Sequence, residues 1–373
     1  MKIWNLTIPT LLGTENIVAN EVRALGYETS SVTDGRVNFI GDAEAVALAN
    51  IRLRSAERVM VRLTSFTATS FEELFERTKA FPWEEWIGKD DAFPVTGNSL
   101  KSALHHVPSC QSIIKKAVAT RLSSVYHVER LEELKALYPI RFSIYKDEVT
   151  LYFDTSGASL YKRGWRTESV LAPMRETLAY AMIDMSFWRG DRPLLDPFSG
   201  SGTIPVEAAL YACHIAPGLR RHFTAETWVD KIPKEMWKDV RDEAIAEIDR
   251  SRDTVIFASD IDPEAVEIAK ENARRAGVDK KIRFQVSDMA RVKPFREKGC
   301  IICNPPYGER LMDQKACEVL YRKMGRKFAE FPEAKKFILT SHEKFEACYG
   351  RPADKRRKVY NGMLKCYVYQ YFK

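Results

Sequence analysis

The sequence Asp-Pro-Phe-Ser-Gly-Ser-Gly-Thr at residues 196–203 decides the fold. It follows the apolar pair Leu194-Leu195 and precedes residues 204–212, whose apolar side chains have helical spacing. Glycines at a strand-to-helix turn allow the backbone to approach a ligand closely. The dense run of Gly and Ser that begins at Asp196 therefore predicts a ligand-binding loop, and a plain tight turn is the weaker interpretation.

Three kinds of ligand compete for this loop. A phosphate loop needs G-x-x-x-x-G-K-[ST], and no such lysine is present. A dinucleotide loop needs G-x-G-x-x-G, but Pro205 stands at the third glycine position, and Asp196 would place a negative charge near a pyrophosphate. The carboxylate instead suits a cationic cofactor with a free amino group, such as S-adenosylmethionine. The loop residues predicted to bind it are Asp196, Phe198, Ser199, Gly200, Ser201, Gly202 and Thr203.

Further acidic residues follow the next strand-like segments. Asp260 comes after residues 255–258, where a carboxylate can accept both ribose hydroxyls. Asp262 precedes Pro263 and is expected to cap the following helix. Asp288 comes after residues 282–286, where it can accept from an adenine amino group. Ligands bind at successive strand ends in such folds, so the predicted cofactor site also includes Asp260, Ile261, Asp288 and Met289.

A second motif, Asn304-Pro305-Pro306-Tyr307, follows the strand-like residues 299–303. Two prolines enforce an extended, rigid segment. The Asn304 oxygen and the Pro305 carbonyl can then accept two N–H bonds of a planar exocyclic amine, while Tyr307 stacks on its ring. In isolation the motif also fits a Pro-rich turn with a surface tyrosine. Behind the glycine loop and the acids, it predicts that all four residues are catalytic.

The segments around these motifs predict the fold class. After Asp154, a helix expected over residues 173–188 is followed by strands at 194–195, 255–258, 282–286, 299–303 and 336–340, which alternate with helices. Such alternation indicates an α/β fold with a parallel sheet covered by helices. Residues 358–360 and 364–372 indicate a hairpin with the two-residue turn Asn361-Gly362.

The first 155 residues have an α+β pattern. Helices are expected over residues 12–25, 43–50, 70–86 and 109–125, and strands over 37–40, 58–66, 93–96, 141–145 and 148–153. Lys115, Lys116 and Arg121 lie on the helix expected over 109–125. They are candidates for contacts with RNA phosphates, although a solvated helix face explains them equally well.

Composition limits the class of protein. A length of 373 residues exceeds one ordinary domain, and 45% hydrophobic with 29% charged residues is typical of a globular protein. No apolar run is long enough to span a bilayer, and no signal peptide is evident at the N-terminus. The seven cysteines lack framework spacing, so we expect reduced thiols in the cytoplasm. Cys300-x-x-Cys303 has no second pair, and no metal is expected.

The net charge of +7 is concentrated near the C-terminus. Residues 301–373 contain 16 Lys and Arg against 8 Asp and Glu, whereas residues 1–300 contain 42 against 43. The basic run Lys355-Arg356-Arg357-Lys358 lies in this part. A basic patch fits a polyanionic partner, and a solvated charged edge is the alternative.

The motifs resemble those of class I methyltransferases that methylate amino groups. Residues 163–166, Arg-Gly-Trp-Arg, and residues 172–178, Ala-Pro-Met-Arg-Glu-Thr-Leu, are similar to the segment before the catalytic domain of THUMP-domain RNA methyltransferases. Over nearly the whole chain, the sequence resembles the N-terminal half of the bacterial 23S rRNA guanine-N2 methyltransferase RlmL. The resemblance implies a ferredoxin-like segment at 1–55, a THUMP RNA-binding domain at 56–155, and a Rossmann-like methyltransferase domain with a seven-strand sheet at 156–373.

By this resemblance, the protein uses S-adenosylmethionine to methylate the N2 amine of a guanine in 23S rRNA. Alternatives are an adenine-N6 DNA methyltransferase, guanine-N2 methylation of tRNA, or a catalytically silent RNA-binding module. No DNA-reading motif is recognisable in the first 155 residues. One departure is that residues 211–253 separate the glycine loop from Asp260, where about 20 residues are usual. We interpret this stretch as an inserted helical segment that could help to hold the substrate.

Overall fold

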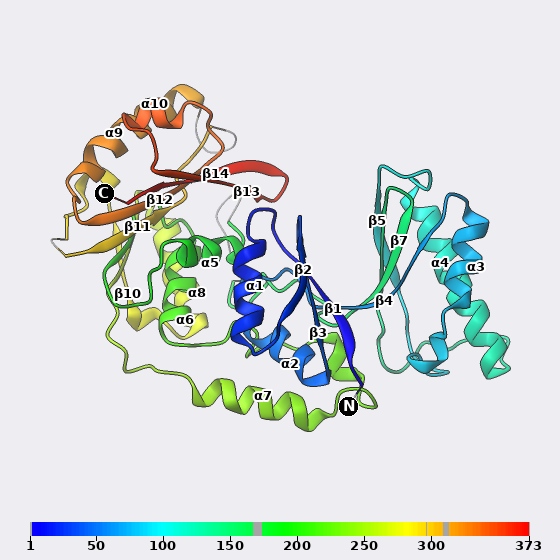
Figure 1. The fold of residues 1–373 in the computed structure, drawn as a ribbon. Helices are drawn as coiled ribbons and strands as arrows, with labels where there is room; N and C mark the ends of the chain where they lie inside the picture. The colour runs from blue at the N-terminus through cyan, green and yellow to red at the C-terminus, as the bar shows by residue number, and fades with distance from the viewer. Residues whose placement is uncertain (1, 167–173, 296, 309–312, 373) are drawn as a thin grey trace.

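Two seven-stranded sheets organise the chain in the computed structural model (Figure 1). The structure describes residues 2–166, 174–295, 297–308 and 313–372. The first sheet has the order β2-β3-β1-β4-β7-β6-β5. Its strands are β1 (Trp4–Pro9), β2 (Thr29–Thr33), β3 (Arg36–Gly41), β4 (Met60–Thr67), β5 (Val95–Leu100), β6 (Ile140–Tyr145) and β7 (Glu148–Asp154). The helices of this half are α1 (Glu15–Ala24), α2 (Ala43–Arg52), α3 (Phe71–Ala80) and α4 (Val107–Tyr126).

This first sheet is continuous across the predicted boundary at residues 55 and 56. Strand β4 pairs antiparallel with β1 on one side and with β7 on the other. The two regions therefore share one hydrogen-bonded sheet. Strands β1 and β2 were not expected from the sequence. In β2 only Thr29 is partly covered and the other side chains are exposed, so this strand has no apolar alternation to reveal it.

The second sheet has the order β10-β9-β8-β11-β12-β14-β13. Its strands are β8 (Leu194–Asp196), β9 (Ile256–Asp260), β10 (Ile282–Val286), β11 (Gly299–Cys303), β12 (Ala334–Thr340), β13 (Lys355–Asn361) and β14 (Leu364–Tyr371). The first five strands in this order are parallel to one another. Strands β14 and β13 form a hairpin that pairs antiparallel with β12 through β14. Helices α5 (Glu176–Met185), α6 (Thr203–Ala212), α8 (Pro263–Ala276), α9 (Gln314–Ala329) and α10 (Phe345–Tyr349) belong to this half. The predicted α/β fold class is confirmed.

Local sequence signals explain several element ends. Asp262 caps α8 by accepting from the backbone N–H of Glu264 at 2.9 Å, as expected. Gly277 ends the same helix in the left-handed conformation, with φ of 73°. Helix α3 stops at Ala80, short of the expected residue 86. Pro82 disfavours a helical conformation at Phe81, whose ψ is 140°.

Two further expectations about elements need correction. The helix expected over residues 173–188 is α5, which spans only Glu176–Met185, and Pro173 lies outside the described residues. The hairpin turn is formed by Gly362 and Met363, because Asn361 pairs with Leu364. Glycine stands first in the turn, where a φ of 66° suits it. The predicted turn was therefore one residue early.

The stretch predicted to be an insertion packs against the N-terminal half. Its helix α7 (Lys234–Ala246) lies against α2. Trp228 and Trp237 are buried in the same hydrophobic core as β1 and β4. The Trp228 ring stacks on Tyr138 with a centroid separation of 4.8 Å. These two tryptophans are therefore part of the core that joins the stretch to the N-terminal half.

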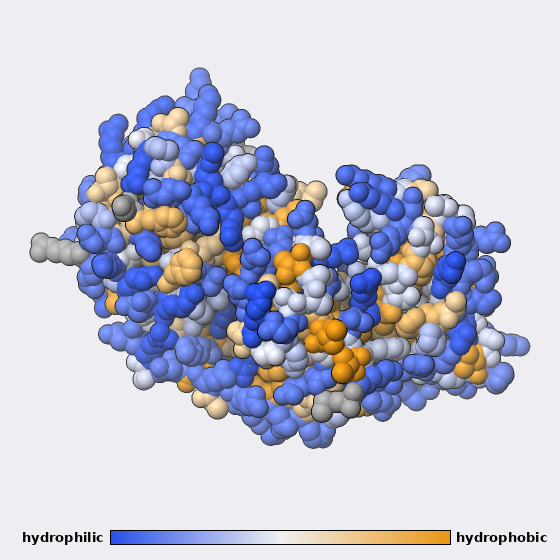
Figure 2. All heavy atoms as spheres, viewed as in Figure 1, coloured by the Kyte–Doolittle hydropathy of each residue, from blue (hydrophilic) through white to orange (hydrophobic). Residues whose placement is uncertain are grey.

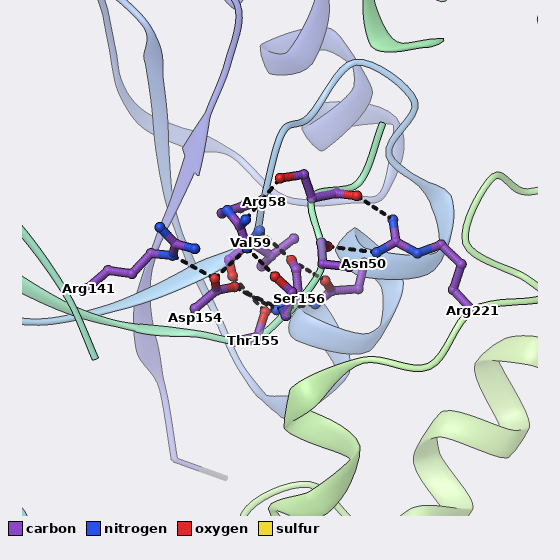
Figure 3. A network of polar contacts seen from close by, with 11 residues as sticks. Asn50, Arg58, Val59, Arg141, Asp154, Thr155, Ser156 and Arg221 are labelled. Atoms are coloured by element: carbon purple, nitrogen blue, oxygen red, sulfur yellow. Dashed lines mark hydrogen bonds and ion pairs between the residues drawn. The ribbon is translucent and has the colours of Figure 1, made fainter. Parts of the chain in front are cut away.

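A buried polar network holds the halves together where β7 ends (Figure 3). The Asp154 carboxylate, 1% exposed, accepts from Arg58 Nη1 at 2.5 Å and from Arg141 Nε at 2.7 Å. Its other oxygen accepts from the backbone N–H groups of Ser156 and Gly157. A buried charge with four donors is well compensated. The start of β4, the end of β7 and the following linker are thereby fixed together.

Asn50 extends this network into α2. Its amide donates to Thr155 Oγ1 at 2.8 Å and accepts from Ser156 Oγ at 2.6 Å. Arg221, from the stretch before α7, donates to the carbonyls of Ala158 and Ser159. Burial, with the positive charges of Arg163 and Arg58, lowers the pKa of Arg221 to about 10. The linker after β7 is thus bound from both halves of the chain.

Candidate active site

Four neighbouring strands bring the predicted site residues to one edge of the second sheet. In the parallel register Asp196 pairs with Ala258 and Asp260 pairs with Val286. On the other side of β8, Ile301 of β11 pairs with Leu195, so Asn304 leaves the sheet at the same edge. The chain order reverses between β8 and β11, which is the position where ligands bind in open α/β sheets. We call this place the carboxyl edge.

The glycine loop is tied to strand β9. The Ser199 N–H donates to the Ser259 carbonyl at 2.9 Å, and the Gly200 N–H donates to Asp260 Oδ2 at 2.8 Å. Gly202 precedes α6 with φ of 86°, and a Cβ there would lie 3.0 Å from Ala269 Cβ. The positive φ and the close approach of α8 both favour glycine at this position. The loop is therefore held at the start of α6, as the sequence predicts.

Asp196 lies beneath this loop and is 1% exposed. Its Oδ1 accepts from the Phe198 N–H at 3.1 Å. Burial raises the pKa of Asp196 well above its usual value, and the negative charge of Asp260 adds to the shift. A cationic group bound here would offset both effects and favour the ionised form. This environment fits the amino group of the predicted cofactor.

Buried hydroxyl groups beside Asp196 also fit a bound ligand. Within the described ranges, Ser199 Oγ and Ser259 Oγ are buried and have no hydrogen-bond partner. Buried polar atoms are nearly always paired in folded proteins. A ligand with polar groups at this edge would provide the missing partners. Ser259 was not among the predicted site residues, because a single serine inside a strand gives no signal of its own.

The remaining predicted cofactor residues have different environments. Asp260 Oδ1 accepts from the Asp262 N–H at 3.1 Å, and Ile261 between them is 69% exposed. Asp288 caps the short 3₁₀ helix η4 (Met289–Arg291) by accepting from the Ala290 N–H at 2.8 Å. Met289 is 4% exposed and packs in the core beside β8 and β11.

The second motif follows β11 directly. Asn304 Oδ1 is buried and has no hydrogen-bond partner among the residues that the structure describes. The Pro306 carbonyl accepts from the Tyr321 hydroxyl at 2.7 Å, and this hydroxyl also lies 3.1 Å from Thr340 Oγ1. The Tyr307 hydroxyl accepts from Asn361 Nδ2 at 3.1 Å. The motif is thus anchored by α9, β12 and β13, while the Asn304 oxygen remains available for a ligand.

A guanidinium group that the sequence did not single out holds the glycine loop. Arg166 donates to Ser201 Oγ and to Thr203 Oγ1, both at 2.7 Å. Its Nε donates to Glu176 Oε1 at 2.9 Å. Burial raises the pKa of Glu176, although the neighbouring Arg166 opposes the shift. Arg166 appeared in the sequence only as part of a family segment. Its partners lie 35 and 37 residues away, so no local pattern marks the contact.

Several of the weaker sequence candidates are buried or paired within the protein. Cys300 and Cys303 are buried on β11, and burial raises the pKa of both thiols. Lys115 pairs with Glu133, and Arg121 pairs with Glu84. These two cations are therefore already compensated within the protein.

Neither a metal-binding cluster nor a membrane-spanning helix occurs in the described part of the chain. It contains no group of three or more His, Cys, Asp or Glu side chains placed to hold a metal ion. None of its helices is both long and apolar enough to cross a membrane.

Family models match three parts of the chain. The RlmL ferredoxin-like domain matches residues 5–60, the THUMP domain matches residues 68–154, and the RMKL-like methyltransferase domain matches residues 163–370. The order of the three matches is the order that the resemblance implied.

Relatives cover the chain from end to end. The protein named "Putative RNA methyltransferase YpsC" from Bacillus subtilis (strain 168) is 44% identical over 100% of this chain and 97% of its own length. The "Ribosomal RNA large subunit methyltransferase K/L" of Aliivibrio fischeri (strain MJ11) is 33% identical over 96% of this chain. The chain spans only 52% of that protein's length.

Solved structures share the whole fold. SMU.472 in complex with SAH is 40% identical, covers 100% of this chain and 98% of its own, and superposes with a TM-score of 0.95. A structure from Listeria monocytogenes str. 4b F2365, described as a "predicted N6-adenine-specific DNA methylase", is 46% identical. It covers 100% of this chain and 96% of its own, with a TM-score of 0.92. This chain therefore belongs to the RMKL-like methyltransferase family, with a THUMP domain and an RlmL ferredoxin-like domain before the catalytic domain.

Proposed function

We propose that this protein is an S-adenosylmethionine-dependent RNA methyltransferase that methylates the N2 amine of a guanine in 23S rRNA. The observation that carries the proposal is the Asn304 side-chain oxygen, which is buried at the carboxyl edge without a protein partner among the described residues. An unpaired buried acceptor costs about 1–3 kcal/mol. The exocyclic amine of a base would supply the missing donor.

The cofactor assignment has support from the family and from a relative. The chain has a methyltransferase domain, and SMU.472 was solved with SAH, the product of S-adenosylmethionine after methyl transfer. In our proposal Asp196 receives the amino group, Asp260 the ribose hydroxyls and Asp288 the adenine amine. Ile261 and the backbone of Met289 line the same edge. The loop residues 198–203 approach the cofactor through their backbone.

We assign the chemistry to Asn304, Pro305, Pro306 and Tyr307. When bound, S-adenosylmethionine supplies a methyl group that is already activated by its sulfonium. The protein therefore mainly aligns the amine, and such positioning can contribute several kcal/mol. Accepting both N–H bonds on Asn304 and on the Pro305 carbonyl favours a pyramidal nitrogen with a more available lone pair. No base is needed before transfer, because the nitrogen becomes acidic only once it is methylated.

The target base has to leave its stack to reach this site. Flipping costs a few kcal/mol. Stacking on Tyr307 returns about 1–3 kcal/mol. Asn361 holds the Tyr307 hydroxyl, so the ring is already oriented before the base arrives. A preoriented ring loses little side-chain entropy on binding.

RNA is supported as the substrate by the relatives and by the THUMP domain. Both curated relatives described above are named as RNA methyltransferases. The chain spans about half of the K/L protein, so the 23S rRNA assignment is taken from one part of a longer relative. We further propose the division into residues 1–55, 56–155 and 156–373, with the first two parts delivering RNA to the third.

The test is methyl transfer by the purified full-length chain with labelled S-adenosylmethionine. The substrates are total RNA and, separately, genomic DNA from a strain that lacks the gene. Product nucleosides are identified by mass spectrometry. N2-methylguanosine in large-subunit rRNA is the expected result. Label confined to tRNA, or found only as N6-methyladenine in DNA, would overturn the substrate assignment.

A further inference from the structure

The β13–β14 hairpin has one face that the catalytic assignment does not use. Opposite residues of antiparallel strands share a face, and alternate residues face opposite sides. Val359 pairs with Cys366, and both are fully buried in the core of the second sheet. Their neighbours therefore project from the other face. These neighbours are the cross-strand pairs Lys358 with Tyr367 and Tyr360 with Lys365.

This second face alternates basic and aromatic side chains. Lys358 and Lys365 are exposed, while Tyr360 and Tyr367 are half-buried. Lys365 Nζ lies 5.5 Å from the centroid of the Tyr367 ring. Within the described part of the chain, neither lysine has a carboxylate within ion-pair distance. We call Lys358, Tyr360, Lys365 and Tyr367 the hairpin patch.

The tip of the hairpin lies beside the catalytic motif. Asn361, the last residue of β13, donates from its side chain to the Tyr307 hydroxyl at 3.1 Å. Thr340, the last residue of β12, pairs with Tyr367 of β14. The first three residues of β14, 364–366, therefore continue beyond the end of β12. The turn therefore extends past the carboxyl edge. Met363 in this turn is 99% exposed.

The β13–β14 hairpin borders a hollow in the molecular surface. In Figure 1 the hairpin tip points from the second sheet toward the side where β5 and β7 lie, and Figure 2 shows the surface hollowed between them. The backbone edge of β13 is covered at Lys358, because the loop at Gly13 approaches the Lys358 carbonyl too closely for a Cβ. At that point a partner would meet side chains of the hairpin and not a free strand edge.

We infer that the hairpin patch, with Met363 at its tip, binds the single-stranded RNA that flanks the target nucleotide. The inference rests on the proposed function. Alternating cations and aromatic rings are the chemistry that recognises a single strand, because lysines meet phosphates while rings stack on bases. An exposed apolar tip fits against a base that has lost its stacking neighbour. Asn361, which contacts Tyr307, directly follows Tyr360 on β13 and projects from the opposite face of the hairpin. The patch therefore lies one residue from the catalytic motif, so flanking nucleotides would meet it as the target base enters the site.

The test is binding of a fluorescent oligouridylate to the full-length chain, followed by anisotropy over a range of salt concentrations. Lys358→Gln combined with Lys365→Gln should raise Kd about tenfold. The salt slope should fall by about 1.4, because each lost phosphate contact on a single strand removes about 0.7. The affinity for SAH should not change. The matched control is Lys234→Gln with Lys280→Gln, which removes the same charge from two exposed lysines of α7 and η3 (Asp279–Lys281).

A second variant tests the aromatic component. Tyr360→Leu keeps an apolar side chain on the strand and should raise Kd about fivefold or more, with an unchanged melting temperature. If both hairpin variants bind oligouridylate as the control does, the inference is wrong. Failure of the proposed function would give a different result. The wild-type chain would transfer no methyl group to RNA, while the hairpin variants would still bind oligouridylate more weakly than the wild type. Methylation of DNA alone would overturn RNA as the partner.

Discussion

Two polar regions of this protein differ in how completely their buried groups are paired. Around Asp154, the carboxylate has four donors, and the Asn50 amide uses both its nitrogen and its oxygen. At the carboxyl edge, Ser199, Ser259 and Asn304 each have a buried oxygen without a partner among the described residues. Both regions join segments that are far apart in the sequence.

The difference separates a structural role from a binding role. A fully paired network lowers the free energy of the folded chain and leaves no group for a ligand. Unpaired buried oxygens cost stability, and at the carboxyl edge a bound ligand would complete them. Substitutions in the two regions should therefore change different measurements: stability around Asp154, and turnover at the carboxyl edge.

The largest effect is expected at Asn304. Asn304→Ala should lower kcat by about 10³-fold or more, as removal of one preorganised polar group does in other enzymes. The affinity for SAH, measured by calorimetry, should stay close to that of the wild type. Asn98→Ala, an exposed asparagine on β5, is the matched control. Loss of SAH binding in Asn304→Ala would contradict its assignment to the substrate amine.

Asp154→Ala tests the other region. The substitution leaves Arg58 and Arg141 without their shared carboxylate, so the free energy of unfolding should fall by about 3 kcal/mol. Urea denaturation measures this change, and Asp239→Ala, at an exposed position of α7, serves as the control. The kcat of the folded fraction should be retained. A stable variant with low kcat would show that the Asp154 network takes part in turnover.

A titratable group near the junction of the halves predicts a pH dependence of stability. Glu21 accepts from the backbone N–H groups of Arg54 and Ser55, and desolvation raises its pKa from 4.5 to about 7. The folded chain therefore retains the proton while the unfolded chain releases it. Stability from this group is fully present below pH 4.5 and is lost as the pH rises to about 7, by about 3 kcal/mol in total.

Glu21→Gln isolates this contribution, because the amide does not titrate. Urea denaturation at several pH values between 4.5 and 7 should give a shallower fall in stability for the variant than for the wild type. Parallel curves for the two proteins would show that Glu21 does not carry the dependence.

The smallest predicted effect is the coupling between Asn361 and Tyr307. Asn361→Ala and Tyr307→Phe each remove the same hydrogen bond. Each should lower kcat/KM for RNA severalfold, and the double variant should be no worse than either single one. The coupling free energy should be about 1 kcal/mol. Additive effects would mean that the two side chains act independently.

The sequence was most informative where local rules determine structure. Strands β10 and β11 have the predicted bounds, and the glycine loop begins α6 as expected. Asp262 caps α8 because a cap depends on residues within one helical turn. The acids and Asn304 could be placed at one edge from strand order alone.

Long-range contacts could not be predicted in this way. The contact of Arg166 with Ser201 spans 35 residues, and that of Asn361 with Tyr307 spans 54. Neither follows from propensity or spacing, because each depends on how helices and strands pack. The burial of Trp228 and Trp237 could not be predicted for the same reason, because it depends on packing against the N-terminal half of the chain.

The central claim is that the Asn304 oxygen is reserved for the substrate amine. The most direct test is a crystal structure of the full-length chain with SAH and a short RNA that contains the target guanosine. We predict that the exocyclic amine lies within hydrogen-bonding distance of Asn304 Oδ1 and of the Pro305 carbonyl. An Asn304 oxygen that is paired with a protein group, with the base amine bound elsewhere, would contradict the claim.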